Sequence, residues 1–167
     1  MKSLVSQLAN YAHYHRDKRN IYTHFIGIPL IVYALAVLLS RHGFTITPEL
    51  TLTPAALVVA ISCVYYLFLS LSLGLIMSVL MAAALVGAAP LAALPWPQWL
   101  GWGVGLFLLG WLFQFVGHYF EGKKPAFVDD LIGLIIGPLF VVVELLFMLG
   151  LYRGLNRDIE QLAGKVR

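Results

Sequence analysis

The sequence is poor in charge. Only 11% of its 167 residues are Asp, Glu, Lys or Arg, and none of these occurs between Glu49 and Glu121. In an ordinary soluble domain, roughly a quarter of the residues are charged. A membrane-spanning helix needs roughly 20 consecutive residues that are mostly apolar. With 60% hydrophobic residues, the chain has too much apolar surface for a soluble fold. The composition therefore predicts an integral membrane protein.

Cysteine is equally scarce, because Cys63 is the only one and lies within an apolar run. A single cysteine excludes an internal disulfide and any metal site built from several cysteines.

The polar N-terminal segment lacks the short apolar core and cleavage site of a secretory signal, so we expect the first span to act as its own insertion signal. The net charge of +3 comes largely from basic residues beside apolar runs, which favours contact with membrane lipids and predicts no nucleic-acid partner.

The apolar runs predict an all-α membrane bundle that forms a single domain over residues 1–167. Leu4, Leu8, Tyr11 and His15 have the spacing of one helical face, which predicts an amphipathic N-terminal helix. Four to five apolar segments follow, depending on whether the last one, interrupted at Gly137-Pro138, spans the membrane. The expected ranges are 3–18 for the amphipathic helix, 21–40, 55–72, 74–94 and 99–119 for the spans, 131–151 for the broken segment and 152–167 for a surface tail.

Positive charges choose between five crossings and four. Five crossings place six basic residues on the first side and five on the other, a poor fit to the positive-inside rule. If the segment broken at Gly137-Pro138 is re-entrant, the four basic residues of the tail return to the first side and the balance becomes ten against one. We therefore predict four full spans with both chain ends on the cytoplasmic side, in a bacterial inner membrane or, in a eukaryote, the endoplasmic reticulum.

Three histidines lie at the polar edges of the apolar runs. His15 continues the apolar stripe of the first helix, His24 begins the first span, and His118 ends the fourth. Three spans separate the first span from the end of the fourth, so all three histidines are expected at one membrane face. The other two differ in setting: His13 falls on the wet side of the first helix, and His42 lies in a polar connection.

A shared metal site is one interpretation of this pattern. Neutral imidazole is a common ligand of zinc and iron, and ionisable groups inside a membrane are candidates for function. The alternative is that each ring separately contacts a neighbouring helix or lipid headgroups. His15 and His24 converge only if the chain bends between them, and we expect that bend at residues 17–20. Glu144, in the last apolar segment, is either an acid near the site or a helix–helix hydrogen bonder.

The residues around these histidines resemble a known family. Tyr14-His15, Asn20, His24, Gly27 and Pro29 are followed by WLFQFVGHYFEGKKPAFVDDL over residues 111–131. This pattern is similar to the Fe(II)-dependent 2-hydroxy fatty acid dioxygenases, small membrane proteins of phytosphingosine degradation that were long grouped as a domain of unknown function. The resemblance covers nearly the whole chain.

The resemblance implies an activity and a ligand set. A 2-hydroxy fatty acid and O2 would react at Fe2+, and the acid would be shortened by one carbon, which is alpha-oxidation. The family histidines correspond to His15, His24 and His118, with His13 as a tentative fourth ligand. We expect Asn20, Gln114 and Glu121 to orient the ligand rings or bind the substrate head group. Nearby basic residues are expected either to attract that head group or to contact lipid, namely Arg16, Lys18, Arg19, Lys123 and Lys124.

The sequence also allows two non-enzymatic functions. A small transporter would use Glu144 beside the Gly137-Pro138 break as the polar site of a discontinuous helix. A membrane scaffold would have replaceable histidines. The sequence does not specify the oligomeric state.

Overall fold

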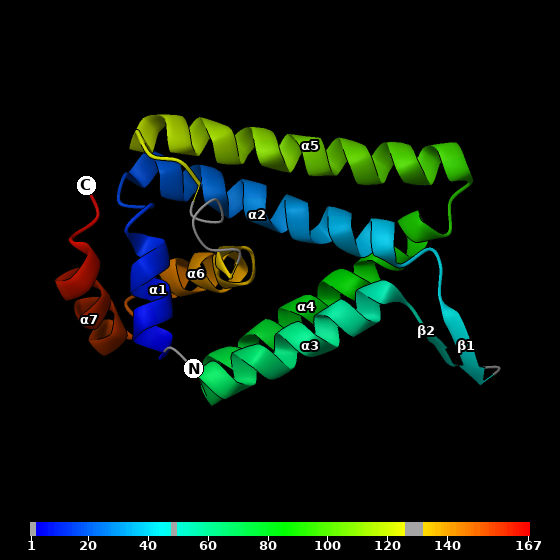
Figure 1. Ribbon diagram of the computed structural model, residues 1–167, viewed down its shortest axis with the longest axis horizontal. Coiled ribbons are helices and arrows are strands. Elements are labelled where there is room, and N and C mark those ends of the chain that lie inside the picture. Colours follow the sequence, from blue (N-terminus) through cyan, green and yellow to red (C-terminus); the bar gives the residue numbers. More distant parts are fainter. Residues whose placement is uncertain (1–2, 48–49, 126–131) are drawn as a thin grey trace. The chain divides into compact units, whose positions relative to one another are not determined.

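The computed structural model describes residues 3–47, 50–125 and 132–167 of the chain. The described part is helical apart from one short pair of strands (Figure 1). Its elements are α1 (Leu4–Ala12), α2 (Lys18–Leu39), β1 (Phe44–Thr47), β2 (Leu50–Leu52), α3 (Pro54–Leu69), α4 (Leu71–Ala92), α5 (Trp96–Glu121), α6 (Gly133–Met148) and α7 (Arg153–Ala163). The prediction of a helical membrane protein is confirmed.

Three helices, α2, α4 and α5, are long and apolar enough to cross a membrane. The predicted span 55–72 corresponds to α3, which has 16 residues. At 1.5 Å per residue it is roughly 24 Å long, shorter than the roughly 30 Å of a hydrocarbon core. Four full spans were expected, and the fourth crossing would have to come from the bent pair of α6 and α7.

The last apolar segment breaks later than predicted. α6 continues through Pro138, and the bend of 116° lies between its end at Met148 and the start of α7 at Arg153. Pro138 lies near the beginning of α6, where its missing N–H costs the helix one backbone bond. The true break contains Gly150 and Tyr152, both with positive φ, a conformation that ends helices. The predicted start at residue 131 lies outside the described residues.

The first helix is shorter than predicted. It was expected to reach residue 18, but α1 ends at Ala12 and the chain bends over residues 13–17. Continuing the helix would direct the backbone N–H groups of Arg16 and Asp17 to carbonyls one turn earlier. Instead, both N–H groups donate to the carboxylate of Glu121, at 2.9 and 2.7 Å. A contact distant in sequence therefore overrides the local periodicity.

The polar connection after α2 forms a two-stranded ribbon. β1 and β2 are antiparallel, with Phe44 opposite Leu52 and Thr45 opposite Thr51. Apolar residues and threonines alternate along β1, the pattern of a strand with two unlike faces. The predicted polar connection therefore contains paired strands, in agreement with the alternation in its sequence.

The chain divides into two compact units. One contains residues Pro29–Gly110, in which α3 and α4 pack side by side as a hairpin (Figure 1). The hairpin turns at Ser70, the N-cap of α4, slightly before the junction of the predicted spans 55–72 and 74–94. A Cβ on Gly74 would lie 2.6 Å from the backbone of Leu67, so a glycine allows this close approach.

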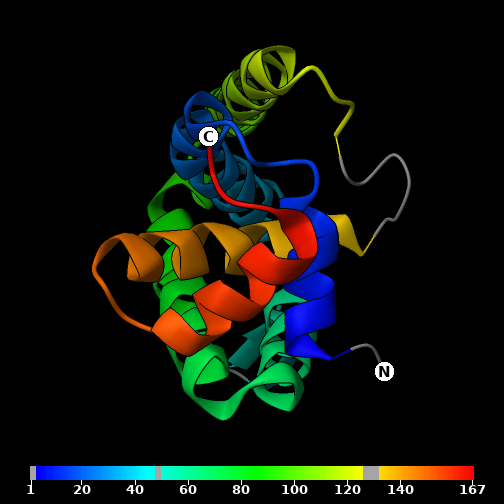
Figure 2. The same cartoon turned by 90° about the vertical axis from the view of Figure 1, so that its left-hand side faces the viewer.

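The other unit contains Met1–Ile28 and Trp111–Arg167. Within it, α1 packs against both α6 and α7 (Figure 2). It also includes the first turns of α2 and the last turns of α5, and so all the site residues that the sequence predicted. The expectation of a single domain over 1–167 remains a prediction.

Candidate metal centre

Three histidines, His15, His24 and His118, meet inside the unit formed by Met1–Ile28 and Trp111–Arg167. One nitrogen of each ring lies within 4.8 Å of the corresponding nitrogens of the other two. All three side chains are buried, with exposed fractions of 0%, 1% and 6%. The three rings come from the bend after α1, the start of α2 and the end of α5. We call these three residues the histidine cluster.

Backbone carbonyls orient two of the rings. His15 Nδ1 lies 2.8 Å from the carbonyl oxygen of Tyr11, and His24 Nδ1 lies 2.9 Å from that of Asn20. A carbonyl oxygen can only accept a hydrogen bond, so each Nδ1 carries the proton. In a neutral imidazole this leaves the lone pair on Nε2, the arrangement that commonly prepares histidine to bind a metal.

The two Nε2 atoms of His15 and His24 face each other at 3.0 Å. With both lone pairs directed inward they repel, unless a proton or a metal ion lies near both. Burial lowers the pKa of His15 well below its usual range, and the neighbouring His24 lowers it further. A proton is therefore a poor way to relieve the repulsion.

A metal ion fits the donor set of the cluster. Two nitrogens bound in cis to one ion at about 2.1 Å lie roughly 3 Å apart, close to the observed Nε2 spacing. His118 Nδ1 is buried and has no hydrogen-bond partner among the described residues. Three imidazoles suit iron, zinc or copper and leave coordination positions free for other ligands.

The ring of His15 is also fixed by stacking. It lies parallel to the Tyr11 ring, with centroids 4.2 Å apart and planes within 3°. Phe140 on α6 contacts the same two rings. His15 thus keeps its predicted place on the apolar side of α1, although it lies beyond the end of the helix.

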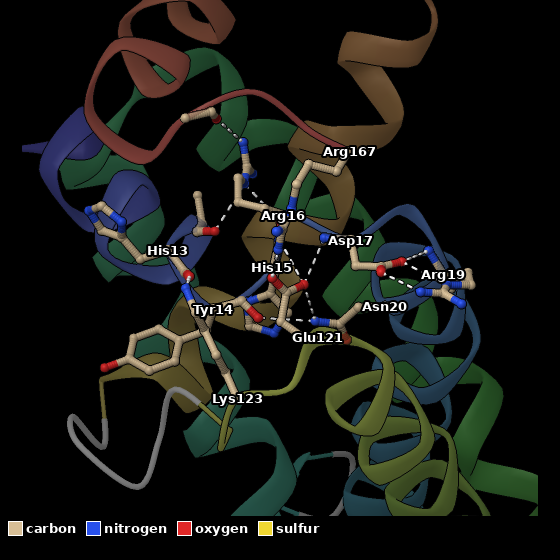
Figure 3. Close-up of polar contacts among 12 residues, drawn as sticks. His13, Tyr14, His15, Arg16, Asp17, Arg19, Asn20, Glu121, Lys123 and Arg167 are labelled. Carbon is tan, nitrogen blue, oxygen red and sulfur yellow. Dashed lines mark hydrogen bonds and ion pairs between the residues drawn. The ribbon is translucent and has the colours of Figure 1, made fainter.

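Glu121 holds the bend that carries His15 (Figure 3). Besides the N–H groups of Arg16 and Asp17, its Oε2 accepts a hydrogen bond from Asn20 Nδ2 at 3.1 Å. Glu121 lies three residues after His118 on α5, so one helix end supplies both a cluster ring and the acceptor for the opposite segment. Its carboxylate orients the chain and does not itself join the cluster.

Arg16 is buried, and its side chain forms hydrogen bonds to several elements near the cluster. Its guanidinium donates to the carbonyls of Ala12 and His15 and to the carboxylate of Glu144 on α6, at 3.0, 2.9 and 3.1 Å. Glu144 is therefore the partner of a buried cation, which decides between its two predicted roles in favour of hydrogen bonding. Arg16 was expected at the lipid surface or the head group. In the sequence, the only indication of a buried basic partner was Glu144 itself, an acidic residue within an apolar segment.

The start of α2 is capped by Asp17. Its side chain accepts from the N–H of Arg19 at 2.9 Å and pairs with the Arg19 guanidinium at 2.8 Å. These contacts lower the pKa of Asp17 to about 2, so the cap is charged at neutral pH, and a negative charge there favours the helix. The bend that brings His15 to His24 thus lies at residues 13–17, slightly before the predicted 17–20.

Two amides beside the cluster keep polar atoms without partners. Gln114 and Asn20 are buried, each one turn before a cluster histidine on its own helix. Gln114 Nε2 and Asn20 Oδ1 have no hydrogen-bond partner among the described residues. A buried amide group without a partner costs on the order of 1–3 kcal/mol, so both atoms are available to bond a ligand or a water molecule.

The structure separates His13 and His42 from the cluster. His13 is exposed, and its ring lies apart from that of His15 (Figure 3). The tentative fourth-ligand role is therefore not supported by this placement. His42 makes an edge contact with Trp99 in the other unit. Lys123, expected near a head group, donates to the His13 carbonyl at 2.6 Å.

One known protein family matches most of the chain. The profile of a family described as 2-hydroxy-palmitic acid dioxygenase Mpo1-like matches residues 1–149. The chain belongs to this family. It is 34% identical to the 2-hydroxy-palmitic acid dioxygenase MPO1 of Saccharomyces cerevisiae over 159 residues, which are 94% of this chain and 87% of the relative. No solved structure matches the chain.

The family match includes the whole histidine cluster, together with Asn20, Gln114, Glu121 and Glu144. It ends before α7 and the segment that follows it.

Proposed function

We propose that the protein is an Fe(II)-dependent dioxygenase that shortens 2-hydroxy fatty acids by one carbon. The observation that carries the proposal is the histidine cluster, in which two rings have their lone pairs fixed inward. Membership of a family described as 2-hydroxy-palmitic acid dioxygenase supplies the reaction class. The proposed metal ligands are His15, His24 and His118.

When bound, iron supplies redox chemistry with O2 and a template for the reactants. The chain's own residues bind and orient. His15 and His24 present neutral Nε2 atoms because their Nδ1 protons are held by the Tyr11 and Asn20 carbonyls. Glu121 keeps the two helix ends together through the bend.

The unpartnered amide atoms match the head group of a 2-hydroxy acid. A carboxylate accepts hydrogen bonds, and the free Nε2 group of Gln114 can donate one. The 2-hydroxyl can donate to Asn20 Oδ1. A substrate with one polar and one apolar end suits a site where polar residues lie at the ends of the apolar helices α2 and α5.

We further propose that the site faces the cytoplasm, in a bacterial inner membrane or an endoplasmic reticulum membrane. The many basic residues expected on the side of the histidine cluster support this orientation. Membrane lipids, the 2-hydroxy fatty acid and O2 are the partners that the proposal requires.

The transporter alternative loses its main support. It depends on Glu144 as a free polar site beside a helix break, but α6 is continuous at Pro138 and Glu144 pairs with Arg16. The scaffold alternative does not account for two imidazole lone pairs held face to face at 3.0 Å.

Turnover by the purified protein tests the proposal. Protein loaded with Fe(II) is incubated with 2-hydroxypalmitate under O2, and the products are identified by mass spectrometry. We expect a fatty acid with one carbon fewer, and no shortening of palmitate, which lacks the 2-hydroxyl. Unchanged 2-hydroxypalmitate in the presence of bound iron would refute the activity.

A further inference from the structure

The segment after α7 returns to the histidine cluster. α7 ends at Ala163, and Gly164 has a φ of 84°, a left-handed conformation that glycine adopts without strain. The chain then runs along the bend between α1 and α2, where Figure 3 shows Arg167 beside Arg16 and Asp17. We call residues 164–167 the return segment.

Backbone hydrogen bonds join the return segment to both sides of Asp17. The N–H of Arg167 donates to the Arg16 carbonyl at 2.7 Å, and the Arg167 carbonyl accepts from the N–H of Lys18 at 3.1 Å. The backbone of Arg167 therefore forms hydrogen bonds to Arg16, which precedes Asp17, and to Lys18, the first residue of α2. These bonds are independent of the Arg167 side chain.

Side chains add two further contacts to the return segment. Arg16 Nη1 donates to the Gly164 carbonyl at 3.0 Å, while other atoms of the same guanidinium hold the His15 carbonyl and Glu144. The Arg167 guanidinium approaches Glu121 Oε1 at 3.4 Å. This Arg167 contact is largely exposed on the arginine side, so we expect it to contribute less than the backbone bonds.

The bend depends on such external contacts. Residues 13–17 lie between two helices, and the N–H groups of Arg16 and Asp17 donate to Glu121 rather than to the preceding turn. His15 is covalently bonded to Arg16, whose backbone is held by Glu121 on its N–H and by Arg167 on its carbonyl. A shift of that backbone moves the His15 ring relative to His24 and His118.

We propose that the return segment is a clamp that positions His15 for metal binding, with Arg167 as the positioning residue. The inference rests on the proposed metal role of the histidine cluster. It assigns a function to a part of the chain beyond residues 1–149, where the family match ends. The clamp acts through the backbone hydrogen bonds of Arg167. We therefore expect loss of its backbone N–H to weaken metal binding more than loss of its side chain.

Two substitutions at one position and a matched control test the clamp in the full-length protein. Arg167→Pro removes the N–H that bonds the Arg16 carbonyl, whereas Arg167→Ala removes only the side chain. Lys165→Ala removes a neighbouring exposed cation as the control. Fe(II) affinity is measured anaerobically by equilibrium dialysis with metal analysis, using the metal alone.

We expect Arg167→Pro to weaken Fe(II) binding by about 10- to 100-fold, the usual effect of losing a group that orients a metal ligand. Arg167→Ala should weaken it by only a few fold, and Lys165→Ala should leave it unchanged. Helix content should stay the same in all three variants because the helices keep their own hydrogen bonds. Equal affinity in Arg167→Pro and the unsubstituted protein would overturn the clamp.

Hydrogen exchange of the metal-free protein separates failure of the clamp from failure of the proposed function. The amides of residues 14–18 should exchange about tenfold faster in Arg167→Pro than in Lys165→Ala, whether or not iron binds. Unchanged exchange overturns the clamp. If the unsubstituted protein binds no iron, the metal role of the cluster fails, and the proposed positioning of a metal ligand fails with it.

Discussion

At the scale of single residues, the site depends on which ring nitrogen carries the proton. His15 and His24 each follow, by four residues, a carbonyl that accepts from Nδ1. His13 has no equivalent burial. The distinction between His13 and His15 followed from helical phase in the sequence, and it holds although α1 ends before either residue.

Substitution of the histidines should separate ligands from bystanders. His15→Ala, His24→Ala and His118→Ala each remove one imidazole from the cluster, and we expect each to reduce bound iron to below a tenth of its normal amount at micromolar iron. His13→Ala and His42→Ala are the matched controls and should retain it, because neither lies in the cluster. Metal analysis of the purified variants gives the answer, and equal retention in all five would point to a scaffold.

Glu121 should matter for stability as well as for the site. Glu121→Gln removes the charge that receives the N–H groups of Arg16 and Asp17. Hydrogen bonds to charged groups contribute about 1.5–3 kcal/mol each, so the free energy of unfolding should fall by about 2 kcal/mol. Denaturation in detergent measures this change.

Asp158→Asn is the control for Glu121→Gln because Asp158 is exposed on α7. It also removes one negative charge, yet it should change stability by less than about 0.5 kcal/mol. An equal effect of the two substitutions would show that the hydrogen bonds of Glu121 are not what holds the bend.

At the scale of elements, α2 and α5 approach each other closely at Gly117. A Cβ added there would collide with Thr23 Oγ1 and Asn20 Oδ1, and would lie 3.1 Å from His24 Nδ1. The absence of a side chain at this position therefore lets the end of α5 bring His118 to the start of α2.

Gly117→Ala should separate the two helix ends and weaken iron binding at least tenfold. Gly105→Ala on the same helix is the control, because a Cβ there meets nothing within 4 Å. Alanine also favours a helix over glycine by about 1 kcal/mol, so Gly105→Ala should be neutral or slightly stabilising. Iron affinity of the two variants, measured side by side, tests whether this contact sets the ligand spacing.

Element boundaries were less predictable than element types. Apolar runs located α2, α4 and α5, since a long run without charge has few alternatives. The end of α1 was not predictable, because Glu121, more than a hundred residues away, receives the N–H groups that would have continued the helix. The sequence predicted a break of the last apolar segment at Gly137-Pro138, whereas the helix ends later, where Gly150 and Tyr152 adopt positive φ values.

At the scale of the whole molecule, the candidate site is assembled from both ends of the chain. The sequence predicted the histidines and their shared membrane face from helix count and phase. It did not predict the partners that fix them, since Arg16, Glu144 and Arg167 meet only through tertiary contacts. Charge alone assigned Arg16 to the surface, where most arginines lie.

The proposed membrane sidedness can be measured by labelling. Arg167 is hydrogen bonded to Arg16, so α7 should lie on the same side of the membrane as the bend. In a Cys63→Ser background, His13→Cys and Asp158→Cys should react with an impermeant maleimide only after the cells are opened. Ile46→Cys, beyond the span α2, should react in intact cells. Reaction of Asp158→Cys together with Ile46→Cys would contradict the return of α7.

The central claim is that the histidine cluster holds the iron that performs the oxidation. The most direct measurement adds Fe(II) in steps to metal-free protein and follows the shortening of 2-hydroxypalmitate under O2 against iron bound per chain. We predict that activity rises linearly and stops at one iron per chain, and that His24→Ala shows neither binding nor activity. Activity that is independent of added iron, or that persists in His24→Ala, would contradict the account.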